Sequence, residues 1–171
     1  MRPTVLQTLD HGVRRLVPFT LCLILLLLAV VPMTAPGFLR SAPLVTVMCV
    51  YFWAVHRPDM MGYLGGFSLG LLEDLLMHTP LGVSSLVLML VQFVVLTQYR
   101  FFVGKPFLII WWALALIALG AILLKALIIA ALTGHVVAPS AVFSSYGLTL
   151  LLYPPLAWVF SRAERLLIRA T

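Results

Sequence analysis

Charged side chains are scarce in this chain. They make up 9% of its 171 residues, whereas hydrophobic residues make up 63% and the mean hydropathy is +1.15. A water-soluble domain carries about a quarter charged residues, and no soluble fold of this length could hide so much apolar surface. The scarcity of charge therefore excludes a soluble domain and predicts an all-α integral membrane protein.

The residues that usually carry catalysis or bind metal are also few. The two cysteines, Cys22 and Cys49, lie inside apolar runs, and the four histidines never stand two together at the spacing of metal ligands. A disulfide framework or a metal centre would need clustered ligands, so we interpret the cysteines as small core residues. The chain has no glycine-rich phosphate loop, and Ser84, Ser85, Ser144 and Ser145 have no histidine or acid at a helical offset. We expect no metal, no cofactor and no enzymatic activity.

The net charge of +6 could suggest nucleic acid, but the basic residues are not gathered on one solvated face, as in a nucleic-acid binder. They lie between apolar runs, which we place at about 16–35, 41–56, 60–77, 81–99, 107–132 and 141–160. The connections are short, so residues 1–171 form a single transmembrane domain with six spans. The second and third runs are shorter than the roughly 20 residues that cross a bilayer. They are therefore expected to pack against protein, with a re-entrant pair as the alternative.

Six spans distribute the basic residues very unequally between the two sides of the membrane. One side receives Arg2, Arg14, Arg15, Arg57, Arg100, Lys105, Arg162, Arg165 and Arg169, and the other receives Arg40 alone. Positive residues concentrate on the cytoplasmic side of membrane proteins. The asymmetry predicts that both termini are cytoplasmic and leaves Lys125 inside the fifth span.

The third run carries a row of small residues that ends in an acid. Gly62, Gly66 and Gly70 recur every four residues, and Asp74 continues the row. This spacing places them on one face of a helix, where glycines allow another backbone to approach closely. An acid at the end of such a face is costly in lipid and needs a partner.

Glu73, Asp74 and Lys125 are expected at similar depths. At 1.5 Å per residue, Asp74 lies about 7 Å and Lys125 about 10 Å below the outer surface. We therefore expect Lys125 to contact Glu73 or Asp74. The charges could form an ion pair that docks the third helix on the fifth, contact a partner's helix, or line a proton or solute pathway. A proton pathway would require more titratable groups in the middle of the membrane, and the other helices supply none there.

The stretch GFSLGLLEDLLMHTPLGVSSL at 66–86 resembles the MreD family of rod shape-determining proteins. That family shows a glycine-rich third helix, a G-L-x-x-D centre and a following P-L-G turn. Here these are residues 70–74, in which Glu73 precedes the family's acid, and residues 80–82. With the length, the span count and the absence of further domains, the resemblance covers the whole chain.

The resemblance implies a non-catalytic subunit of the elongation machinery in the bacterial cytoplasmic (inner) membrane. Its implied partners are MreC, the actin-like MreB, the glycosyltransferase RodA and a penicillin-binding transpeptidase, which together direct lateral wall synthesis. The implied fold is similar to the six-helix substrate-binding subunits of energy-coupling vitamin transporters.

Two functions remain for the membrane-embedded charges and glycines. In the first, a single-span partner helix such as that of MreC docks on Gly62, Gly66, Gly70, Glu73 and Asp74. In the second, the chain is a small-solute-binding subunit of a transporter, with Glu73, Asp74 and Lys125 facing an outward cavity beneath Ser41, His78 and His135. The outer loops are short and poor in aromatic and polar groups, so the second function ranks lower.

Overall fold

The described part of the chain is helical. The computed structural model describes residues 18–29, 44–58, 61–102, 104–134 and 138–169, and these residues contain helices and no strand. The helices are Pro18–Ala29, α2 (Val45–His56), α3 (Tyr63–Met77), α4 (Val83–Thr97), α5 (Tyr99–Phe102), α6 (Phe107–Thr133) and α7 (Pro139–Arg169). The prediction of an all-α chain is confirmed for these residues. Ser41, His135 and Arg40 lie outside them.

The helices differ greatly in length. Two are long and apolar enough to cross a membrane by length and composition, namely Phe107–Thr133 and the first part of α7, Pro139–Arg162. The helices Pro18–Ala29, α2 and α4 are apolar but shorter. At 1.5 Å per residue, α6 extends for about 40 Å and α2 for about 18 Å, whereas the hydrocarbon core of a bilayer is about 30 Å thick. Six full crossings therefore stay a prediction.

Helix α2 is the centre of the bundle. All its residues from Val45 to Val55 are buried, and it contacts α3, α4, α6 and α7. A helix that is apolar all round has no face suited to water, so it is stable only when other helices or lipid surround it. The hydroxyl of Tyr51 donates to the carbonyl of Ile110 at 2.8 Å and fixes α2 against α6. The expectation that the second run packs against protein is confirmed.

The two cysteines are part of the same core. Cys22, on the helix Pro18–Ala29, and Cys49, on α2, are both fully buried and both free thiols. Their interpretation as small core residues agrees with this burial. The third run is different, because Leu64, Phe67 and Leu75 expose one side of α3.

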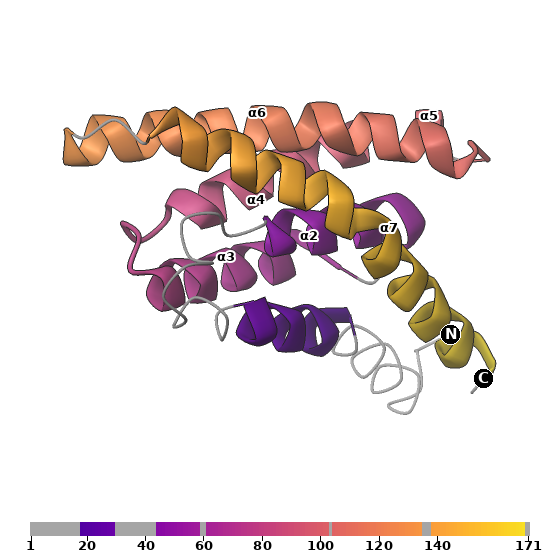
Figure 1. Ribbon diagram of the computed structural model, residues 1–171. Coiled ribbons are helices and arrows are strands. Elements are labelled where there is room, and N and C mark those ends of the chain that lie inside the picture. Colours follow the sequence, from indigo (N-terminus) through magenta and orange to yellow (C-terminus); the bar gives the residue numbers. More distant parts are fainter. Residues whose placement is uncertain (1–17, 30–43, 59–60, 103, 135–137, 170–171) are drawn as a thin grey trace.

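Helix α6 lies along one edge of the bundle, and α7 begins beside it and then runs obliquely away toward the C-terminus (Figure 1). Proline at 154 has no N–H to donate to the carbonyl of Leu150. The indole Nε1 of Trp111 donates to that carbonyl instead, at 3.2 Å. The predicted sixth span, 141–160, and the predicted separate tail thus form one helix, which continues through Pro154 and Pro155 to Arg169.

Candidate functional site

Asp74 caps a helix other than its own. Its Oδ2 accepts a hydrogen bond from the backbone N–H of Gly82 at 2.8 Å, and its Oδ1 accepts one from Ser84 N at 3.1 Å. The hydroxyl of Thr79 also donates to Oδ1, at 2.7 Å. Gly82 is the N-cap of α4 and has no side chain that could accept these bonds. A carboxylate at this point meets both the unpaired N–H groups and the positive end of the α4 dipole.

The turn that carries these groups is tight. His78 ends α3 in the left-handed region, with φ of 53°, and Gly82 begins α4 with φ of 98°. Glycine adopts such a φ without steric cost. The P-L-G turn seen in the sequence therefore places the N–H of Gly82 within hydrogen-bonding distance of Asp74, which lies eight residues before it in the chain.

Glu73 points to different partners. Its Oε1 lies 2.5 Å from the Lys125 ammonium, and its Oε2 accepts a hydrogen bond from the Thr46 hydroxyl at 2.5 Å. The side chains of Lys125 and Glu73 are 16% and 9% exposed. Of the two neighbouring carboxylates, Glu73 is thus the one that the structure brings to Lys125. The three side chains come from α2, α3 and α6, so this cluster joins the central helix to two others.

The glycine row contacts α4 of the same chain. A methyl group added at Gly70 would lie 2.5 Å from the backbone nitrogen of Ser85, and one at Gly66 would lie 2.6 Å from Oε1 of Gln92. Gly62 is exposed and has nothing within 4 Å of such a methyl group. The sequence had suggested an intermolecular use for this face. The structure corrects that expectation at Gly66 and Gly70, because α4 occupies the space in front of them.

Several polar residues of this site were missed in the sequence. Thr46 binds Glu73, Ser85 donates from α4 to the carbonyl of Phe67 at 3.1 Å, and Gln92 donates through Nε2 to the carbonyl of Met61 at 2.6 Å. Gln92 is a single amide inside the apolar run of α4, and a polar residue at such a place usually has a specific partner. That signal could have identified Gln92. The hydroxyls of Thr46 and Ser85 offered no comparable signal, because such groups also bond within their own helix.

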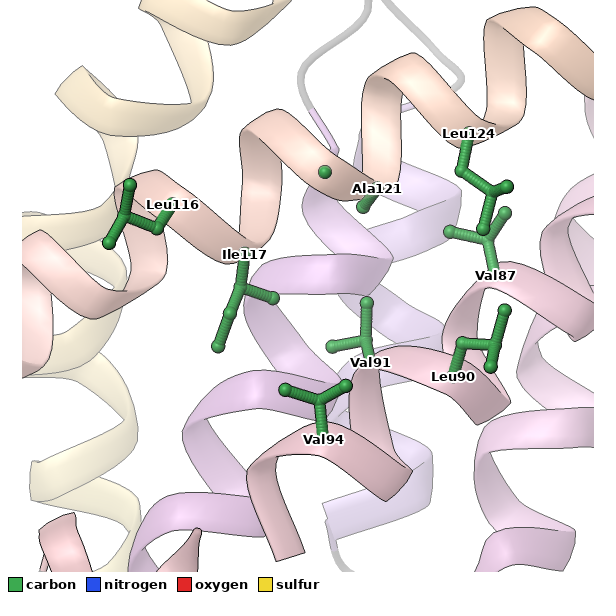
Figure 2. A pocket seen from close by; sticks show the side chains of 9 residues that line it. Val87, Leu90, Val91, Val94, Leu116, Ile117, Ala121 and Leu124 are labelled. Atoms are coloured by element: carbon green, nitrogen blue, oxygen red, sulfur yellow. The ribbon is translucent and has the colours of Figure 1, made fainter. Parts of the chain in front are cut away.

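Two apolar grooves flank α4. The α4–α6 groove, shown in Figure 2, has a volume of about 390 Å³. Its lining residues are all apolar: Val87, Leu90, Val91, Val94, Leu116, Ile117, Gly120, Ala121 and Leu124. The second groove lies on the other side, between α3 and α4, and is lined largely by aromatic and aliphatic side chains such as Phe67, Met89 and Phe93. Leu90 lines both grooves.

The arrangement of these side chains favours binding of a partner protein over catalysis or metal binding. Glu73, Asp74 and Lys125 satisfy one another or nearby backbone groups, so their charges are used within the fold. Within the described ranges, no group of three His, Cys, Asp or Glu residues could hold a metal ion. Exposed apolar surface remains open to a partner, and the α4–α6 groove is part of it.

Comparison with known proteins gives one family. The family model described as "MreD: rod shape-determining protein MreD" matches residues 13–163, which is most of the chain. No curated protein and no solved structure matches.

Proposed function

Since the chain belongs to the MreD family of rod shape-determining proteins, we propose that it is a multi-pass scaffold of the bacterial cytoplasmic membrane that binds MreC. In this proposal it links MreC to MreB, to RodA and to a penicillin-binding transpeptidase, and it catalyses no reaction itself. Membership of the family supports the role in rod shape and the non-enzymatic character. The set of partners rests on what the family resemblance implies.

The α4–α6 groove is the observation that carries the proposal, because it suits the single membrane helix of a partner. Apolar surface alone does not drive helices together in a bilayer, since lipid chains are as apolar as leucine. Close approach does favour association, and small residues permit it. Gly120 lies on this groove, and a methyl group added there would have nothing within 4 Å. A partner helix could therefore approach α6 closely at Gly120 while its side chains fill the space beside Val91 and Val94.

The same observations favour a scaffold over a small-solute-binding subunit. A carrier would need Glu73, Asp74 and Lys125 to face a solute. In the described residues, Lys125 and Thr46 bind Glu73, and the α3–α4 turn binds Asp74. Exposing these groups to a solute would first require breaking buried ionic and hydrogen bonds, which is costly in a medium of low dielectric constant.

The test compares two glycines in matched surroundings. Gly120 on α6 and Gly147 on α7 are both exposed helical residues with nothing within 4 Å of an added methyl group. The full chain, tagged at its C-terminus, is expressed in the native host as wild type, Gly120→Phe or Gly147→Phe, and extracted in mild detergent. Co-purified proteins are quantified by mass spectrometry, and cell width is measured in parallel.

We expect Gly120→Phe to lower the recovery of MreC about tenfold, as the loss of close helix packing would. Gly147→Phe should keep both recovery and rod shape near wild type. Equal recovery of MreC with both variants would exclude the α4–α6 groove as the docking surface. Recovery of an ATP-driven transport module with a bound small molecule, in place of MreC, would overturn the scaffold itself.

A further inference from the structure

A second kind of pocket lies at the end of the molecule opposite the α3–α4 turn. This aromatic pocket lies where the C-terminus of α2, the N-terminus of α6 and the proline segment of α7 meet, and its volume is about 260 Å³. Its lining residues are Phe52, His56, Phe107, Tyr153, Pro154, Ala157, Trp158 and Ser161. Unlike the α4–α6 groove, it combines ring faces with polar atoms.

Two stacked pairs of rings form its walls. The rings of Phe52 and His56 stack at a centroid distance of 4.1 Å, and those of Phe107 and Tyr153 stack at 6.1 Å with an interplanar angle of 11°. Phe52 and Tyr153 are almost fully buried, so the ring surface open to a ligand is that of Phe107 and Trp158, which suits the hydrocarbon part of an amphiphile. Trp158, at the rim, is 65% exposed. Large aromatic side chains at helix ends are typical of the membrane–water interface, where their apolar rings and polar edges are both satisfied.

The polar atoms of the pocket have capacity for a ligand. The Nδ1 atom of His56 lies 3.0 Å from the carbonyl oxygen of Phe52, which can only accept. Nδ1 must therefore carry the proton, and the other ring nitrogen is left for a ligand. Ser161 donates to the carbonyl of Ala157 at 2.7 Å, so its oxygen can still accept a hydrogen bond.

Positive charge gathers around the same pocket. The guanidinium of Arg162 lies over the ring of Trp158, 5.8 Å from its centroid. Arg57 follows His56 directly at the end of α2, and Lys105 precedes α6 by two residues. The N-terminus of α6 adds the positive end of a long helix dipole.

We propose that the aromatic pocket binds one anionic phospholipid of the surrounding leaflet, such as phosphatidylglycerol. The rings of the pocket contact the glycerol backbone and the start of an acyl chain. The lipid phosphate meets Arg162, and the hydroxyl groups of the headgroup can donate to His56 and Ser161. A zwitterionic lipid has an ammonium group that Arg162 and the positive end of the α6 dipole repel, so the pocket prefers an anionic headgroup.

Native mass spectrometry of the purified full chain in mild detergent tests this lipid site. The chain is titrated with dioleoyl-phosphatidylglycerol or dioleoyl-phosphatidylcholine, and the fraction with one bound lipid is measured. We expect phosphatidylglycerol to bind at least about fivefold more tightly than phosphatidylcholine. Arg162→Ala should weaken phosphatidylglycerol about fivefold and leave phosphatidylcholine unchanged, because one basic side chain near a headgroup contributes that much. Trp158→Ala should weaken both lipids.

The matched controls are Arg100→Ala and Trp112→Ala. Arg100 carries the same charge but, unlike Arg162, does not lie over Trp158, and Trp112 is 62% exposed, close to the 65% of Trp158. Both control variants should bind phosphatidylglycerol within about twofold of wild type. The proposal is overturned if the two lipids bind equally, if each pocket variant behaves like its control, or if inorganic phosphate alone displaces the lipid.

Discussion

The α3–α4 hairpin and the α6–α7 pair are both apolar helices joined by a short connection, yet they are held together differently. In the hairpin, Gly70 lets two backbones approach, and Asp74 and Ser85 place hydrogen bonds between the helices. In the α6–α7 pair, the hydrogen bonds between the helices run from rings to carbonyls, one from Trp111 and one from Tyr146. The α3–α4 hairpin is thus held by a close approach at a small residue and by buried hydrogen bonds. The α6–α7 pair leaves apolar surface exposed.

Replacing Gly70 should break the hairpin and have the largest effect. The backbone of Ser84 and Ser85 fills the space of an added methyl group and cannot move without displacing α4, so Gly70→Ala should cost about 3 kcal/mol or more. Gly65, on the same helix, is the control, because its added methyl group would lie 3.5 Å from Met61, an ordinary contact. Gly65→Ala should be neutral or stabilising by up to about 1 kcal/mol. Thermal unfolding in detergent measures both, and equal melting temperatures would contradict the close packing.

Removing Lys125 tests the polar cluster that ties the hairpin to α6. Lys125→Met leaves the buried Glu73 without its cation, and we expect a loss of about 2 kcal/mol, since only the hydrogen bond from Thr46 then remains to this side chain. The double variant Glu73→Gln with Lys125→Met should recover most of this loss, because no unpaired charge remains. A double-mutant cycle of melting temperatures gives the coupling, and additive effects would show that the two side chains do not interact.

The smallest effect is expected in the α6–α7 pair. Trp111→Phe keeps the ring but removes the donor to the carbonyl of Leu150, which Pro154 leaves unpaired. We expect a loss of about 1 kcal/mol. Trp112→Phe is the control, since Trp112 is largely exposed. If both variants unfold at the same temperature as wild type, the bond from Trp111 to the carbonyl of Leu150 contributes nothing to stability.

Periodicity and composition predicted the helices but not which neighbour each face meets. The apolar runs located the helices, and Lys125 was expected near Glu73 or Asp74 because a lone cation in lipid needs an acid. The spacing of Gly66 and Gly70 correctly identified a helix face used for close packing. The spacing could not indicate which helix packs on that face, and in the structure it is α4. Grooves depend on the angles between helices and on side-chain packing, neither of which the spacing of residues encodes.

The cap that Asp74 places on α4 has a consequence for biosynthesis. The groups that donate hydrogen bonds to the Asp74 side chain all lie within ten residues of it along the chain. All hydrogen-bond donors to Asp74 have therefore been synthesised once α4 has begun. The hairpin can then enter the bilayer with the Asp74 carboxylate already hydrogen-bonded. Glu73 must wait for Lys125, 52 residues later. Between these two moments Glu73 has its hydrogen bond from Thr46 but lacks its cation, so the hairpin reaches its full set of polar contacts only when α6 has been made.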